Sequence, residues 1–181
     1  SFFMDLATSL TGKWRGGPAK IAVFSSALFG SISGSSVANV VASGSFTIPM
    51  MKRVGFKNHH AGAIEAISST GGQVMPPIMG AGVFILATLT ESDYLTIAAM
   101  NIIPAILFFT FIMLMVDLEA VKSGLKGLPA EEVPDFKTVI KKGWHFFIPL
   151  IVVITLLFNG FSPDYGAFWG IVSTLVLSWR N

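Results

Sequence analysis

Residues 30–39 read Gly-Ser-Ile-Ser-Gly-Ser-Ser-Val-Ala-Asn, and residues 68–77 read Ser-Ser-Thr-Gly-Gly-Gln-Val-Met-Pro-Pro. Both stretches of small and polar residues interrupt sequence that is otherwise apolar enough for a membrane interior. Lipid offers no hydrogen-bond partner to a freed backbone group, so irregular backbone at that depth must be buried in protein or line a cavity. Two such breaks in neighbouring segments are typical of a transporter's binding site.

The composition indicates an integral membrane protein. The chain is 52% hydrophobic and only 12% charged, whereas a soluble domain carries about 25% charged residues. The net charge of +2 is too small to indicate nucleic-acid binding, and the absence of cysteine excludes disulfides and thiolate metal sites. Because the sequence starts at Ser1 without an initiator Met, we expect an internal piece of a longer polytopic protein.

Runs without charged residues predict the membrane segments. A crossing helix needs about 20 residues, because each residue adds ~1.5 Å against a hydrocarbon core of ~30 Å. Residues 94–116 fit one crossing, residues 143–163 fit another, and residues 61–89 fit a crossing with a break in its middle. The last run, residues 165–179, is short for a full crossing.

Residues 21–51 fit either one long tilted helix or a hairpin that enters the membrane and returns. A single crossing would place basic residues on both sides of the membrane, against the positive-inside rule. A hairpin keeps them on one side and, with the crossings above, puts all 12 Lys and Arg residues on the cytoplasmic face. We therefore expect a re-entrant hairpin. The basic residues that decide this are Lys13, Arg15 and Lys20 before it, and Lys52, Arg53 and Lys57 after it.

The two breaks are predicted to form one binding site. The hairpin tip falls at Ser31–Ser36, where one arm ends with free carbonyls and the next begins with free N–H groups. In the crossing at 61–89 we expect a half-helix ending near Ser69, an unwound Thr70–Met75, and a second half-helix starting at Pro76-Pro77.

Such breaks support two kinds of chemistry. Carbonyl oxygens at half-helix ends, together with Ser, Thr and Asn oxygens, can coordinate Na⁺. Half-helix N-termini can hold an anionic group without a buried Lys or Arg. The alternative is a structural membrane subunit whose Gly and Ser residues only permit close helix packing. Two clusters on adjacent elements, one with a double proline, favour the site.

At these residues the chain resembles the large permease subunit of tripartite ATP-independent periplasmic (TRAP) transporters, and it looks closest to the fused permeases that work with TAXI-type binding proteins. The similarity covers about residues 12–127. It rests on the two stretches quoted above, on Gly44-Ser-Phe-Thr-Ile-Pro-Met-Met-Lys-Arg-Val-Gly55, and on Val116-Asp-Leu-Glu-Ala120. Many relatives of the dicarboxylate type carry Asp where this chain has Asn39.

The resemblance implies an all-α, multi-pass protein of the bacterial inner membrane, half of an inverted-repeat, elevator-type transporter. It also implies Na⁺-driven uptake of an organic acid delivered by a periplasmic binding protein, with small-subunit helices as partners or fused in the same chain. Another ion-coupled carboxylate carrier is the alternative. The implied substrate residues are Ser35, Ser36, Asn39, Thr70 and Gly72, and the implied Na⁺ residues are Ser33, Gly34, Asn39, Ser69, Thr70 and Gly71.

The expected division of the chain follows from these segments. Residues 1–18 form a cytoplasmic lead-in, and residues 19–90 form half of the transport domain, with the hairpin at 19–51 and the broken helix at 61–89. Residues 94–116 form a transmembrane helix, and residues 117–142 form a cytoplasmic connector with a short helix at 135–142. Residues 143–181 form two further transmembrane helices.

Three other features of the sequence bear on function. Glu65 is the one carboxylate near a span, with either an interfacial or capping role or a coupling role, since intramembrane acids are functional candidates. His59-His60 reads as a polar loop rather than a metal site, because no Cys or carboxylate completes a ligand set. No nucleophile–base–acid pattern is visible, so we expect a transporter and not an enzyme, with an intramembrane hydrolase as a weak third option.

Overall fold

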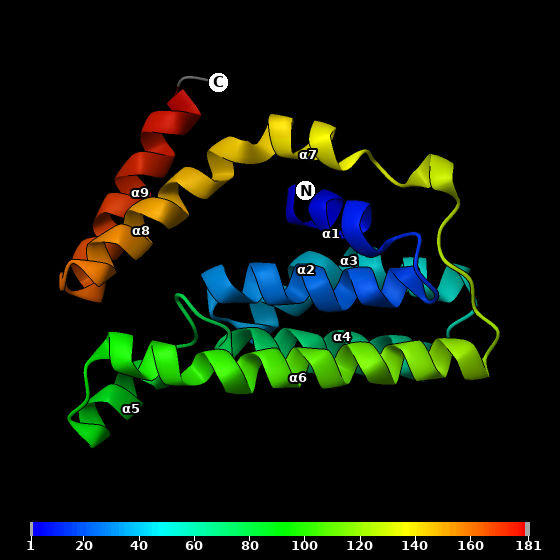
Figure 1. Ribbon diagram of the computed structural model, residues 1–181, viewed down its shortest axis with the longest axis horizontal. Helices are drawn as coiled ribbons and strands as arrows, with labels where there is room; N and C mark the ends of the chain where they lie inside the picture. Colours follow the sequence, from blue (N-terminus) through cyan, green and yellow to red (C-terminus); the bar gives the residue numbers. More distant parts are fainter. Residues whose placement is uncertain (1, 180–181) are drawn as a thin grey trace. The chain divides into compact units, whose positions relative to one another are not determined.

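The computed structural model describes residues 2–179 and divides into two compact units, one up to Phe136 and one from Lys137 onward. All regular elements in residues 2–179 are helical, which confirms the all-α fold class. The helices, labelled in Figure 1, are α1 (Phe2–Thr11), α2 (Gly17–Ser33), α3 (Ser36–Arg53), α4 (Asn58–Gly71), α5 (Gly82–Thr90), α6 (Tyr94–Lys122), α7 (Phe136–Gly143), α8 (Phe147–Phe158) and α9 (Pro163–Trp179). Three short 3₁₀ turns are η1 (Gly72–Val74), η2 (Ala130–Glu132) and η3 (Trp144–Phe146).

Helices α2 and α3 form a helical hairpin in which only Gly34 and Ser35 break the helix. Gly34 reverses the chain with a φ of 61°, a left-handed conformation that suits glycine. Ser35 then caps α3, because its Oγ accepts a hydrogen bond from the Ala38 N–H at 3.3 Å. The two arms are 17 and 18 residues long, because helix continues to the edge of the turn on both sides. The depth of this hairpin in a membrane stays a prediction.

The second break is much longer. Helix α4 runs to Gly71, η1 adds one 3₁₀ turn, and regular helix resumes only at Gly82. The prediction of a half-helix starting at Pro76-Pro77 is therefore wrong. The two prolines give no N–H to the backbone, and Met79 adopts a left-handed φ of 57°, so residues 75–81 run as a loop before α5 begins.

Helix α6 starts where the Asp93 carboxylate accepts the Leu95 N–H at 3.1 Å, and it runs past the predicted end at 116. The extra turns hold Asp117 and Glu119, whose carboxylates pair with basic side chains of preceding segments. By length and composition two segments of residues 2–179 could cross a membrane, Tyr94–Lys122 and Ala130–Phe158, and Asp164–Leu177 is a shorter apolar helix.

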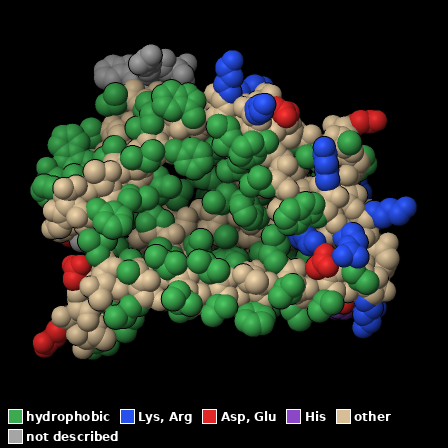
Figure 2. Space-filling model, viewed as in Figure 1, with side chains coloured by type: hydrophobic (Ala, Val, Ile, Leu, Met, Phe, Trp, Pro, Cys, Tyr) green, Lys and Arg blue, Asp and Glu red, His purple; other side chains and the backbone are tan. Residues whose placement is uncertain are grey.

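The first unit has one basic end. Lys20 pairs with Asp117 at 2.5 Å, Arg53 pairs with Glu132, and the Leu128 N–H donates to the Gly12 carbonyl at 2.8 Å. Figure 2 shows many Lys and Arg side chains at the right of the view, where α3 and α6 finish in Figure 1. The basic residues before and after the hairpin thus lie at the same end, as the hairpin interpretation requires.

Helix α2 is the centre of this unit and packs against α1, α3, α4 and α6. Its small residues Ala19 and Ala22 are fully buried, which lets the neighbouring helices approach closely. Around them lies the main apolar cluster, made of Ala19, Ala22, Val23, Met51, Phe56, Ala61, Phe109, Val116 and Ala120. This core fixes the positions of α3 and α4, which carry the two breaks.

In the second unit α8 and α9 pack against each other as a helical hairpin. Gly170 permits close contact, because a Cβ atom at this position would lie 2.8 Å from a Val153 methyl carbon. The short helix predicted at 135–142 is α7, within one residue at each end.

Candidate functional site

The two breaks meet through their backbones. A Cβ atom on Gly30, in the last turn of α2, would lie 2.3 Å from the Gly72 Cα, and one on Gly72 would lie 2.6 Å from the Gly30 Cα. Any side chain at either position would force the two helices apart. The glycines therefore allow the hairpin tip and the end of α4 to touch main chain to main chain, which brings both sequence breaks to one place.

The loop of the second break is held on the hairpin tip. The Ile78 N–H donates to the Ser31 carbonyl at 3.1 Å, so the break satisfies a freed carbonyl of α2. A Cβ atom on Gly34 would lie 2.0 Å from the Met79 carbonyl oxygen, so this glycine is needed for space as well as for its φ. The loop of the second break thus takes a backbone hydrogen bond from the tip, and the two breaks pack closely at Gly34.

Asn39 is fully buried at this junction. Its Nδ2 donates to the Ser26 carbonyl at 2.9 Å, which ties α3 to α2. The same Nδ2 lies 3.1 Å from the positions that Cβ atoms on Gly30 and Gly72 would take. The amide therefore stands beside both glycines, and Asn39 is the one predicted side chain that lies directly at the contact of the two breaks.

A second polar cluster lies further along α3 and α4, around Glu65. This carboxylate is 1% exposed and accepts hydrogen bonds from the Ser43 hydroxyl, from Thr47 Oγ1 at 2.5 Å and from Ser69 Oγ at 3.4 Å. Ser43 also donates to the Asn39 main-chain carbonyl at 2.7 Å, so the cluster is joined to the junction. A capping role for Glu65 does not fit this environment, because the carboxylate is buried between helices and accepts side-chain hydroxyl groups. Its depth in the membrane stays a prediction.

Two buried hydroxyls near the junction have no hydrogen-bond partner in the described part of the chain, Ser26 Oγ and Ser68 Oγ. Ser26 offers its carbonyl to Asn39, and Ser68 lies one turn before Gly72 on the same face of α4. Buried polar groups are nearly always satisfied, so each unpaired hydroxyl calls for an explanation, of which an ion or a water is one.

The other predicted residues are distributed around the junction rather than gathered in it. Ser33, Ser35 and Ser36 lie at the tip, where Ser33 Oγ and Ser35 Oγ accept backbone N–H groups. Thr70 is exposed and donates to the Ala66 carbonyl of its own helix at 2.8 Å. Gly71 faces α6, since a Cβ there would meet the Phe108 ring at 2.1 Å. Binding by any of these residues stays a prediction.

The site offers oxygen atoms and helix ends instead of charges. Residues 26–39 and 68–80 contain no Asp, Glu, Lys, Arg or His. The negative end of α2 and the positive end of α3 meet at the tip, beside the serine hydroxyls. Carbonyl and hydroxyl oxygens suit a hard cation, and the free N–H groups at the start of α3 suit an anionic group.

Sequence reasoning missed Ser43 and Thr47 as members of this region. Asn39, Ser43 and Thr47 recur every four residues, and Glu65 and Ser69 do the same on the next helix. Residues four apart share one face of a helix, so this spacing in charge-free or nearly charge-free sequence was the signal that could have found the buried cluster.

Comparison with known proteins identifies the family. Residues 1–180 match the model of the tripartite ATP-independent periplasmic transporter, DctM component. The chain belongs to this family of TRAP transporter large permeases. The resemblance seen at the two breaks is thereby confirmed over nearly the whole chain. Members of the family are transport proteins of the inner membrane and not enzymes.

Three relatives illustrate the similarity. An uncharacterized protein of Sinorhizobium fredii, y4mL, is 30% identical over 177 residues, 97% of this chain and 42% of the relative. The C4-dicarboxylate TRAP transporter large permease protein DctM of Pseudomonas aeruginosa is 28% identical over 165 residues, 91% of this chain and 38% of the relative. The sialic acid TRAP transporter permease protein SiaT of Haemophilus influenzae is 26% identical over 164 residues, 90% of this chain and 26% of the relative. The chain thus spans less than half the length of each.

Proposed function

We propose that this chain supplies half of the transport site of a TRAP large permease that imports organic anions, driven by a Na⁺ gradient. The hairpin of α2 and α3, together with the broken segment from α4 to α5, forms the moving part of an elevator. A second, inverted copy of this arrangement supplies the other half of the site. The TRAP family membership supports the transport role, and the relatives named for C4-dicarboxylates and sialic acid support an organic acid as substrate.

The contact of Gly30 with Gly72 carries the proposal. It joins two interruptions that are some forty residues apart in sequence, and it does so with backbone alone. Gly72 lies in the 3₁₀ turn that follows α4, and α2 ends three residues after Gly30. A helix pair that only needed to pack would not require both helices to end so close to the contact. Irregular backbone at membrane depth is expected where it lines a cavity for substrate or ion.

Na⁺ is the coupling ion in this proposal, and the residues present fit it. The donor set at the tip consists of carbonyl and hydroxyl oxygens, with two buried hydroxyls unpaired nearby. Gly34 and Gly72 keep side chains away from the backbone oxygens, and Asn39 holds α3 against α2 beside them. When bound, Na⁺ supplies positive charge at a site that has no basic side chain, next to the anion-binding N–H groups of α3.

The proposal extends to topology and partners. The basic end of the first unit faces the cytoplasm, the hairpin enters the inner membrane from that side, and α6 crosses it. Substrate comes from a periplasmic binding protein. Small-subunit helices complete the permease, fused in the same chain as in the TAXI-type permeases.

The test is Na⁺ binding and uptake in the full-length permease. Purified protein is heated in NaCl or in KCl at equal ionic strength, and uptake of radiolabelled succinate is measured in cells with the cognate binding protein. We expect Na⁺ to raise the thermal midpoint and to drive uptake. Ser35→Ala, Asn39→Ala and Thr70→Ala remove oxygen atoms at the tip, at the junction and at the end of α4, and each should weaken both effects.

Ser45→Ala is the matched control, because this exposed serine lies on α3 away from the tip. It should leave the Na⁺ response unchanged. If Asn39→Ala and Ser35→Ala both keep the full Na⁺-dependent shift and the full uptake, the proposed site is wrong. If Na⁺ shifts the midpoint but succinate is not transported, the ion site stands and the substrate is a different organic acid.

A further inference from the structure

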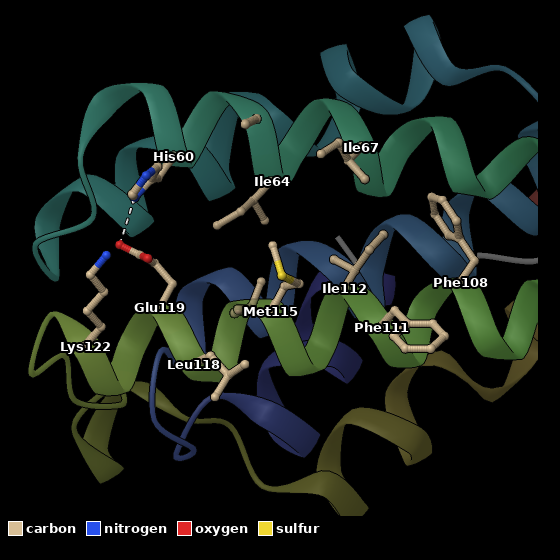
Figure 3. A pocket seen from close by; sticks show the side chains of 12 residues that line it. His60, Ile64, Ile67, Phe108, Phe111, Ile112, Met115, Leu118, Glu119 and Lys122 are labelled. Atoms are coloured by element: carbon tan, nitrogen blue, oxygen red, sulfur yellow. Dashed lines mark ion pairs between the residues drawn. The ribbon is translucent and has the colours of Figure 1, made fainter.

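A groove of about 500 Å³ runs between α4 and α6. Figure 3 shows apolar side chains from both helices pointing into it, among them Ile64 and Ile67 from α4 and Ile112 and Met115 from α6. Three polar residues, His60, Glu119 and Lys122, stand together at one end. The groove is therefore amphipathic along its length, with a long apolar channel and a polar mouth.

The dimensions of the groove fit a hydrocarbon chain better than a helix. Its lining on α6 extends from Phe108 to Lys122, about 21 Å at ~1.5 Å per residue. Over that length, 500 Å³ of space for the centres of water molecules gives a width of about 5–6 Å for those centres. Adding the ~1.4 Å radius of a water on each side makes the groove about 8 Å across. A helix with its side chains is about 10 Å wide, whereas carbon atoms of an extended chain contact their neighbours at about 4 Å. The groove is therefore wide enough for an acyl chain and narrower than a helix with its side chains.

The mouth has the charge that a lipid phosphate requires. His60 Nδ1 and Glu119 Oε1 pair at 3.0 Å, so the carboxylate already has a partner. Among residues 2–179 no ion pair involves Lys122, and its ammonium group is left to bind an anion. The mouth also lies at the basic end of the unit, close to where Lys57 precedes α4 and Lys126 follows α6.

The direction of the groove matches one membrane leaflet. From the polar mouth the apolar lining runs inward along α6, which is long and apolar enough to cross a membrane. Half of a hydrocarbon core is about 15 Å thick, so an acyl chain of the leaflet at the basic end reaches most of the channel. Anionic lipids are attracted to basic residues at that surface, and basic pockets between membrane helices bind their headgroups.

We propose that this groove binds one anionic glycerophospholipid, with an acyl chain between α4 and α6 and its phosphate on Lys122. The lipid fills the space that separates the two helices and holds α6 against the broken segment. This site is distinct from the transport site, and its existence does not depend on the substrate or on Na⁺.

The test uses the full-length permease, purified in detergent and titrated with phosphatidylglycerol or with phosphatidylcholine in native mass spectrometry. We expect a one-lipid complex that is more abundant with phosphatidylglycerol. Lys122→Gln should weaken phosphatidylglycerol binding about fivefold, the contribution of one basic residue at a membrane surface. Lys126→Gln removes a lysine of the same end that does not line the groove, and should leave this complex unchanged.

A second variant tests the channel. Ile67→Trp adds a larger side chain where the residue is half exposed and lines the groove, so the fold tolerates it while the channel is filled. It should remove the one-lipid complex. Ile106→Trp, on an exposed position of α6 outside the groove, is the control and should keep it.

Two results would overturn the proposal. One is equal phosphatidylglycerol binding in the wild type, Lys122→Gln and Ile67→Trp. The other comes from a diazirine-bearing amino acid in place of Met115: photo-cross-linking to lipid supports the proposal, whereas cross-linking to another segment of the permease shows that protein fills the groove.

Discussion

The two breaks differ in how they satisfy the backbone groups that are freed where a helix is interrupted. At the hairpin tip only Gly34 and Ser35 leave the helix, and the reversal is completed locally by a left-handed glycine and a serine cap. The second break needs the whole of residues 72–81, and its loop depends on distant groups. The Ile78 N–H donates to the Ser31 carbonyl of the tip, and the Tyr94 hydroxyl shares its proton between the Pro77 and Ile78 carbonyls.

This difference indicates which break positions the other. The tip is defined by its own residues, so the hairpin presents a fixed surface. The second break takes its shape from that surface and from α6, because its prolines and left-handed Met79 leave backbone groups that the segment cannot satisfy by itself. Substitutions at the tip should therefore affect both breaks, and substitutions at the second break should act locally.

The largest effect is expected for Gly34→Ala. The left-handed conformation costs a non-glycine residue about 1–2 kcal/mol, and the new Cβ would lie 2.0 Å from the Met79 carbonyl oxygen, so both breaks must move. We expect most of the folded permease to be lost, as measured by fluorescence size-exclusion chromatography. Gly62→Ala is the control, because no atom lies within 4 Å of a Cβ at that position. Equal yields of the two variants would contradict the tip's role.

Glu65→Ala should come next. It removes the acceptor of three hydroxyl donors, of which Ser43 and Thr47 join α3 to α4 and Ser69 lies on α4 itself. Buried side-chain hydrogen bonds in membrane proteins average about 0.6 kcal/mol each, so the expected loss is about 2 kcal/mol, visible as a lower thermal midpoint. Glu65→Gln keeps an oxygen acceptor and should recover more than half of this loss. A Gln variant as unstable as the Ala variant would show that hydroxyl binding is not what Glu65 contributes.

Tyr94→Phe isolates the second break. It deletes the hydroxyl that donates to Pro77 and Ile78 and leaves the tip untouched, at a cost of about 1 kcal/mol. Hydrogen–deuterium exchange should speed up in residues 75–81 and stay slow in α2 and α3. Tyr165→Phe, exposed in the second unit, serves as the control. Faster exchange at the hairpin would mean that the dependence between the breaks runs in both directions.

Ser35→Ala should have the smallest effect on stability. Loss of an N-cap oxygen costs about 1 kcal/mol or less when the cap is half exposed and its bond is 3.3 Å long. The expected change is faster hydrogen exchange in the first turn of α3, with little change in the midpoint. Ser36→Ala removes a neighbouring hydroxyl that does not cap the helix, and should leave this exchange unaltered.

The hairpin was predictable from sequence because it follows from the order of residues along the chain, without knowledge of which helices pack together. Basic residues on both sides of 21–51 admit only a reversal if they are to lie on one face, and Gly34 stands where the reversal occurs. The start of the second half-helix was not predictable in this way. Pro76-Pro77 is a common helix start, but hydrogen bonds from the tip and from Tyr94 make a loop more favourable there.

The environment of Glu65 was likewise not predictable from the sequence alone. Its place near the start of a helix suggested the membrane surface, yet the cluster of Ser43, Thr47 and Ser69 makes it a buried residue. The four-residue spacing in the sequence shows that these polar residues share one face of each helix. The sequence does not show which other helix that face contacts, because this depends on the packing of α3 against α4.

The sequence by itself determined that the chain is a helical membrane protein of the TRAP large permease family with two polar breaks in apolar segments. Composition, charge placement and small-residue clusters are properties of the chain alone, so they can be read without coordinates. Only the tertiary structure decided that Gly30 touches Gly72, that Asn39 stands beside both, and that Glu65 is buried. These contacts join residues from different helices, and their geometry is set by how closely α2, α3 and α4 pack around the small residues of the core.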